Sequence, residues 1–130
     1  MSDEETARFV GELVETMVLR NIQFLSKHPR LQLMQAGIVY LESTNGPWRD
    51  VPHTLKARSG DCKSIVPWRL AELRLTGESA RAQVVITDDA ASLFHLQVVR
   101  ENGTIEDTSR LLGMGKPADV ISLHARKDGK

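Results

Sequence analysis

Apolar residues recur at helical spacing over the first part of the chain. Between residues 4 and 27 they fall on one face of a helix, while charged residues fall mostly on the other. Pro29 disfavours a helical residue before it, so the helix should end near Lys27. We expect this amphipathic helix to bury one face, made of Phe9, Val10, Leu13, Val14, Met17, Ile22 and Leu25.

A second apolar run begins after Gly60 and predicts a buried helix. The run ends at Gly77, a residue type that is favoured just beyond a helix C-terminus. Cys62 would then lie at the helix N-terminus. Pro67 falls in the second turn, where proline removes a backbone hydrogen bond, so we expect a kink or a 3₁₀ start.

The second half of the chain predicts three antiparallel strands. Residues 82–87 and 93–100 are rich in Val, Ile, Leu and Phe, and Asn102-Gly103 before residues 104–106 is a hairpin signal. A short turn at 110–114 and a last apolar run at 120–123 should follow, with a frayed tail at 125–130.

Two stretches are less clearly patterned. Residues 31–40 fit a short helix and a buried strand equally well. Residues 42–59 contain Asn45-Gly46-Pro47, Asp50 and Pro52, which predict an irregular surface loop that leads to Gly60.

Length and composition indicate one globular domain. A chain of 130 residues with 41% hydrophobic and 26% charged residues can bury one core, which we expect to span about 31–123. The elements predict an α+β fold in which the N-terminal helix (about 4–27) and the cysteine helix pack on a small antiparallel sheet.

The net charge and the search for targeting patterns exclude some classes of partner and compartment. The 17 basic residues balance the 17 acidic ones, so no overall field favours nucleic acid. The acidic start has no signal-peptide pattern, and no stretch approaches a membrane span. We therefore expect a cytoplasmic protein with neither a nucleic-acid partner nor a membrane span.

The candidate chemistry centres on the one cysteine. A helix N-terminus stabilises a thiolate at Cys62 and offers N–H groups to an oxyanion. His95 on a predicted strand and Asp107 after the next strand can supply a base and its orienting carboxylate. The residues alone leave open whether Cys62 is a nucleophile or buried packing. The four scattered histidines predict no metal site, and we expect no cofactor.

Two segments resemble the transglutaminase-like superfamily of the papain-like cysteine peptidase fold. The first runs from Gly60-Asp61-Cys62 through a helix to Gly77-Glu78-Ser79-Ala80-Arg81. The second is Phe94-His95, an Asn-Gly hairpin and Ile105-Glu106-Asp107, in the order cysteine, histidine, aspartate. The resemblance covers about residues 47–114 and implies a catalytic triad of Cys62, His95 and Asp107.

The resemblance also implies a function. A member would be a cysteine hydrolase, a peptidase or amidase, that acts through a thioester on a peptide or peptidoglycan-like amide, or an acyltransferase. Small stand-alone relatives resemble phage and prophage proteins encoded beside virion genes. The alternative is therefore a virion component, for example of a tail, that uses the fold as a structural module, contacts other virion proteins and is carried in the phage particle.

Two further residues are candidates for the oxyanion or substrate pocket. Trp48 resembles a tryptophan that lines this pocket in some members, although packing against the core is the ordinary role of such a residue. Asp61 precedes the cysteine, where aspartate is also well suited to cap the helix. His53, in the predicted loop, is a weaker alternative to His95 as the base.

Overall fold

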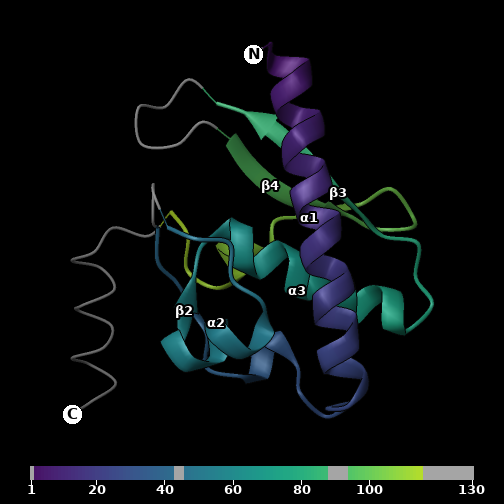
Figure 1. Ribbon diagram of the computed structural model, residues 1–130, viewed down its shortest axis with the longest axis vertical. Helices are drawn as coiled ribbons and strands as arrows, with labels where there is room; N and C mark the ends of the chain where they lie inside the picture. The colour runs from purple at the N-terminus through teal and green to yellow at the C-terminus, as the bar shows by residue number, and fades with distance from the viewer. Residues whose placement is uncertain (1, 43–45, 88–93, 116–130) are drawn as a thin grey trace.

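The computed structural model describes residues 2–42, 46–87 and 94–115, and it has an α+β architecture (Figure 1). The predicted run at 120–123 and tail at 125–130 lie outside the described residues. In chain order the elements are α1 (Asp3–Ser26), the 3₁₀ helix η1 (Leu33–Gln35), β1 (Val39–Tyr40), α2 (Val51–Ala57), β2 (Ser59–Gly60), α3 (Cys62–Leu75), β3 (Arg81–Ile86), β4 (Phe94–Val99), β5 (Ile105–Glu106) and α4 (Thr108–Leu111).

Helix α1 forms where the apolar periodicity predicts it. Ser2 caps its N-terminus by accepting a hydrogen bond from the N–H of Glu5, and the Glu5 side chain accepts one from Ser2 in return. Its apolar face packs along α3 through Val10, Val14, Val18 and Leu25. The predicted face was wrong at one residue, since Phe9 is 52% exposed.

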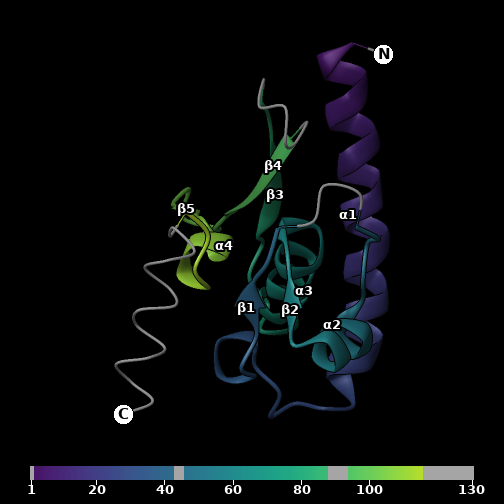
Figure 2. The same ribbon diagram turned by 90° about the vertical axis from the view of Figure 1, so that its left-hand side faces the viewer.

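Helix α3 is the centre of the core. Figure 2 shows α1 on one side of α3, with α4 and β5 on the other. Most α3 side chains are buried, and Trp68 is fully so. Gly77 adopts a positive φ just after the helix, where the N–H of Glu78 donates to the carbonyl of Leu73.

The start of α3 differs from the expectation drawn from Pro67. The helix is α-helical from Cys62 onward rather than beginning as a 3₁₀ helix. Pro67 lies inside it and has no N–H to donate to the carbonyl of Lys63. A single 3₁₀-type bond, from the Ser64 N–H to the Asp61 carbonyl, occurs in the first turn.

The three predicted strands form an antiparallel sheet in the order β3-β4-β5. Alternation along β4 turns Leu96 and Val98 into the core and places His95 and Gln97 on the opposite face. Strand β5 pairs with β4 only at Val98–Val99, so the part of β4 that carries His95 has no β5 partner beside it. The prediction of a small antiparallel sheet packed by two helices is confirmed.

The prediction of irregular chain at 42–59 was wrong for residues 51–57, which form α2. Asp50 caps this helix by accepting the N–H of His53, and Pro52 lies in the first turn, where a missing N–H costs nothing. Arg58 ends the helix in a left-handed conformation with φ 59°. The proline that suggested a loop is instead part of a helix start.

The open stretch at 31–40 resolves into η1 and β1, and β1 pairs in parallel with β2 (Figure 2). Tyr40 lies opposite Gly60, two residues before Cys62. A Cβ atom at residue 60 would lie 3.0 Å from the Cβ of Ser64, because the backbone of β2 runs close to the first turn of α3. Glycine at this position lets the chain turn directly into the cysteine helix.

Among the helices that the structure describes, none has both the length and the apolar character needed to cross a bilayer.

Replacing Gly60 by alanine tests this close approach. The added methyl group would push against Ser64 and strain the folded state. This strain should outweigh the stabilisation that alanine gives by lowering the conformational entropy of the unfolded chain. We expect the free energy of unfolding to fall by about 1–2 kcal/mol in urea denaturation. Gly11→Ala is the matched control, because nothing lies within 4 Å of a methyl group there and α1 should gain about 0.5–1 kcal/mol. Equal effects of the two substitutions would contradict this account.

Candidate active site

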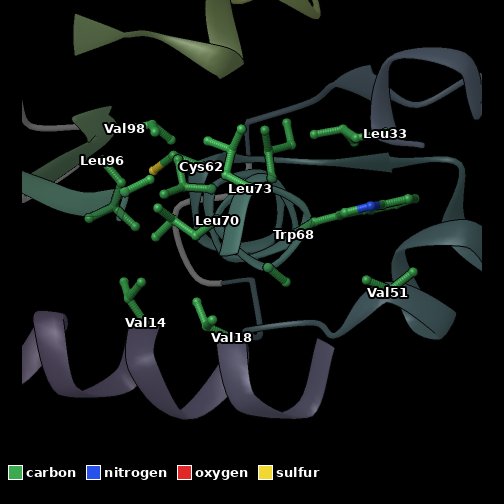
Figure 3. Close-up of a cluster of buried hydrophobic side chains, with 14 of the residues drawn as sticks. Val14, Val18, Leu33, Val51, Cys62, Trp68, Leu70, Leu73, Leu96 and Val98 are labelled. Carbon is green, nitrogen blue, oxygen red and sulfur yellow. The ribbon is translucent and has the colours of Figure 1, made fainter. Parts of the chain in front are cut away.

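Cys62 is the first residue of α3. Asp61 precedes it as the N-cap and accepts a hydrogen bond from the N–H of Lys63 at 3.0 Å, while the Lys63 ammonium lies 3.1 Å from the same carboxylate. Asp61 therefore caps the helix, and its charge is balanced by Lys63. Figure 3 shows the Cys62 sulfur on the side of Leu96 and Val98.

The thiol of Cys62 is buried, with 7% of the residue exposed. Burial, with smaller contributions from the carboxylates of Asp61 and Asp107, raises the pKa of the Cys62 thiol to about 11, although the N–H of Leu96 and the Lys63 ammonium act in the opposite direction. In this conformation the thiol is therefore protonated at neutral pH. A nucleophilic role requires a base that takes the proton during the reaction.

His95 and Asp107 are brought into direct contact, as the strand pattern predicts. The Nε2 atom of His95 lies 3.1 Å from both carboxylate oxygens of Asp107, and both side chains are less than one fifth exposed. A carboxylate on Nε2 holds the proton on that nitrogen, so Nδ1 is left as the basic atom of the neutral ring. This arrangement orients an imidazole to accept a proton.

Two residues that sequence reasoning did not select also hold Asp107. The side-chain amide of Gln97 donates to the Asp107 carboxylate at 3.3 Å, and the Arg110 guanidinium lies 3.4 Å from it. Gln97 is two residues from His95 on the same strand face, and that spacing was the available signal. Arg110 is 69% exposed, so its contact with Asp107 is the weaker one.

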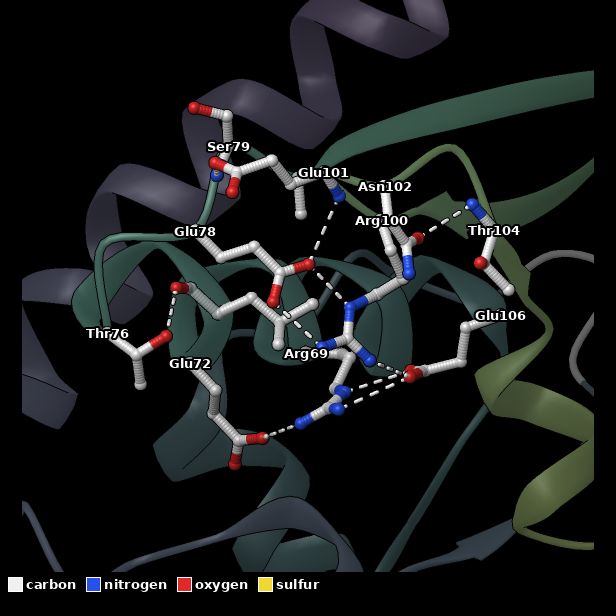
Figure 4. A network of polar contacts seen from close by, with 12 residues as sticks. Arg69, Glu72, Thr76, Glu78, Ser79, Arg100, Glu101, Asn102, Thr104 and Glu106 are labelled. Carbon is white, nitrogen blue, oxygen red and sulfur yellow. Dashed lines mark hydrogen bonds and ion pairs between the residues drawn. The ribbon is translucent and has the colours of Figure 1, made fainter.

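An ion-pair network fixes the strand that precedes Asp107. Glu106 accepts hydrogen bonds from Arg69 on α3 at 2.9 and 3.2 Å, and from Arg100 at 3.2 Å (Figure 4). The Thr108 hydroxyl also donates to Glu106 at 2.7 Å. Since Glu106 is adjacent to Asp107, the network couples the position of the carboxylate to the helix that carries Cys62.

Cys62 packs against the strand that carries His95. The N–H that acts on its sulfur belongs to Leu96, the residue after His95, and the charge of Asp107 also acts on the thiol. Among the described residues, however, no hydrogen bond joins the Cys62 thiol to the His95 ring. The histidine and the aspartate are therefore in direct contact, whereas the Cys62 sulfur lies on the core side of β4 with Leu96 and Val98, the face opposite to His95.

Trp48 lies beside the same strand. Its ring stacks on Phe94, with ring centroids 6.3 Å apart and an angle of 21° between the planes, and it packs against the core. Phe94 precedes His95 on β4, so alternation puts the Phe94 ring on the face of the strand opposite to His95. The stack gives the tryptophan ring a packing contact of the ordinary kind.

His53 belongs to a separate surface contact. It lies in α2, where its ring contacts the Asp50 carboxylate, and its side chain is 69% exposed. Residues 2–42, 46–87 and 94–115 contain no group of three or more histidine, cysteine, aspartate or glutamate side chains arranged to hold a metal ion.

Comparisons with protein-family models, with curated proteins and with solved structures each give no match to this chain.

Glu106→Gln tests the network that positions Asp107. Burial alone would raise the pKa of Glu106, but hydrogen bonds from Arg69 and Thr108 and the nearby guanidinium charges lower it overall. A lowered pKa means that the stabilisation is present above the unfolded-state value of about 4.3 and is lost as pH falls through the folded-state value. We expect the free energy of unfolding, measured by urea denaturation, to be higher in wild type than in Glu106→Gln by about 1–3 kcal/mol at pH 7. The two values should become equal near pH 2.

The control is Glu15→Gln. Glu15 also pairs with an arginine, Arg74, but its side chain is 52% exposed. Its loss should change the free energy of unfolding by less than about 1 kcal/mol. A Glu106→Gln effect as small as that of the control, or one that does not depend on pH, would contradict the role of the network.

Proposed function

We propose that this protein is a cysteine hydrolase of the transglutaminase-like type, with the papain-like arrangement of a cysteine helix against an antiparallel sheet. The observation that carries the proposal is the His95–Asp107 contact at 3.1 Å beside the N-terminus of the helix that begins with Cys62. The resemblance in Gly60-Asp61-Cys62 and in the segments around His95 and Asp107 supports the same assignment. The substrate class is an amide in a peptide or a peptidoglycan-like polymer.

Acylation follows from the protonation state of the site. Because the thiol is protonated at rest, the Nδ1 atom of His95 takes its proton as the sulfur attacks the carbonyl carbon. The tetrahedral oxyanion is held by the N–H of Cys62. His95 then gives the proton to the leaving amine, the carbon–nitrogen bond breaks, and a thioester remains on Cys62.

Deacylation reverses the roles. His95 removes a proton from water as the water oxygen attacks the thioester carbonyl, and it returns that proton to the departing sulfur. An amine in place of water would give acyl transfer. In both steps Asp107 keeps the imidazole in one tautomer and stabilises its cationic form, and Gln97 holds the carboxylate in place.

The second candidate is a non-catalytic module, for example a virion component that contacts other virion proteins. The burial of Cys62 and the lack of a hydrogen bond from its thiol to His95 among the described residues favour this reading. The two candidates differ in whether Cys62 forms an acyl intermediate.

Acylation by p-nitrophenyl acetate tests the proposal. We expect release of p-nitrophenol and an acetyl group on Cys62, detected by intact mass and peptide mapping, and no labelling in Cys62→Ala. Replacing His95 by alanine removes the base and should slow acylation at neutral pH by about 10²–10⁴-fold.

His53→Ala is the matched control, because His53 also contacts an aspartate but is exposed and lies on α2. This variant should react like wild type. Absence of an acyl group on Cys62 in wild type, or equal rates in wild type and His95→Ala, would reject the hydrolase and leave the non-catalytic module.

A further inference from the structure

The chemistry proposed above needs a second hydrogen-bond donor for the oxyanion. Over residues 2–42, 46–87 and 94–115, the N–H of Cys62 has no acceptor, as is usual for the first residue of a helix. That N–H is therefore free to serve as one donor. Oxyanion sites of acyl-transfer enzymes use at least two donors that converge on one oxygen.

Tyr40 occupies the strand next to the entry of α3. In the parallel pair β1–β2 it lies opposite Gly60, two residues before Cys62. Val39 and Leu41 on either side are 58% and 62% exposed, whereas Ile38 is buried. Alternation thus puts Tyr40 on the inner face of β1 with Ile38.

A backbone hydrogen bond ties Tyr40 to the other side of the site. The N–H of Tyr40 donates to the carbonyl of Leu112 at 2.9 Å, and Leu112 caps the short helix α4 that begins just after Asp107. Figure 2 shows β1 between β2 and the α4–β5 region. Tyr40 is therefore held between the start of α3 and the segment that carries Asp107.

The surroundings of the hydroxyl keep it protonated. Burial raises the pKa of Tyr40, and the carboxylates of Glu42, Asp61 and Asp107 raise it further. The backbone of Tyr40 pairs with Gly60 and bonds to Leu112, so the ring extends from a position between the start of α3 and α4. At neutral pH the hydroxyl remains a neutral O–H, which is the form that can donate a hydrogen bond.

We propose that the Tyr40 hydroxyl is the second oxyanion donor, acting with the N–H of Cys62. This inference rests on the hydrolase proposed above. The competing candidate is Trp48, whose ring stacks on Phe94 and packs against the core. Developing negative charge on the substrate oxygen would be bound by a donor that cannot itself ionise at working pH.

Two reactions of the same thiol separate this role from a general effect on Cys62. Acylation by p-nitrophenyl acetate passes through a tetrahedral oxyanion. Alkylation by iodoacetamide forms a sulfur–carbon bond as iodide leaves and creates no oxyanion. Loss of an oxyanion donor should therefore slow the first reaction and not the second.

The experiment measures both rates at pH 7.5 in wild type, Tyr40→Phe and Trp48→Phe. We expect Tyr40→Phe to lower the acylation rate by about 10²-fold at an unchanged alkylation rate. Thermal unfolding followed by circular dichroism checks that each variant is folded. Normal acylation in folded Tyr40→Phe, or an equal fall in both rates, would overturn the inference.

Other outcomes also decide the question. A selective loss of acylation in Trp48→Phe, with Tyr40→Phe normal, would assign the donor to Trp48 and overturn the proposal for Tyr40. If wild type is alkylated at Cys62 but never acylated, the hydrolase and this inference both fail. If wild type is acylated and folded Tyr40→Phe is acylated at the same rate, the hydrolase proposal stands and the role of Tyr40 is rejected.

Discussion

The packing of α3 at the centre of the core is the constraint on which the rest of the structure depends. Helix α1 covers one side of it, and β4 and α4 lie against other parts. Its buried side chains leave little freedom to rotate or slide, since interiors are close-packed. The position of Cys62 at its first residue, and of Arg69 on its flank, is therefore fixed by the core.

The same helix organises the polar side of the molecule. Arg69 holds Glu106, and Glu106 precedes the aspartate that contacts His95. The backbone N–H of Leu96, on the strand that carries the histidine, lowers the pKa of the Cys62 thiol. One helix thus supports both the residue proposed as nucleophile and, through an ion pair, the residue that orients its proposed base.

Much of this arrangement could be predicted from the sequence because it depends on local patterns. Apolar periodicity identifies α1 and α3, and the Asn102-Gly103 hairpin places Asp107 beside the strand of His95. Helix α2 was missed because Pro52 was read as a breaker rather than as a first-turn residue. The position of Tyr40 beside Gly60 could not be predicted, since it depends on a pairing of two-residue strands across α2.

The burial of Cys62 opposes the reactivity that the proposed mechanism needs at neutral pH. It raises the pKa of the Cys62 thiol to about 11, so reactivity at neutral pH cannot come from a free thiolate in this conformation. His95 must accept the proton as the sulfur reacts. The chemistry therefore depends on whether the thiol and the imidazole act together.

The pH dependence of Cys62 alkylation by iodoacetamide, compared between wild type and His95→Ala, tests this claim most directly. The account predicts that wild type reacts readily below the usual thiol pKa of about 8.5, whereas His95→Ala reacts only as the pH approaches about 11. Slow reaction at neutral pH in both proteins, with the same rise toward pH 11, would contradict it and make Cys62 a packing residue.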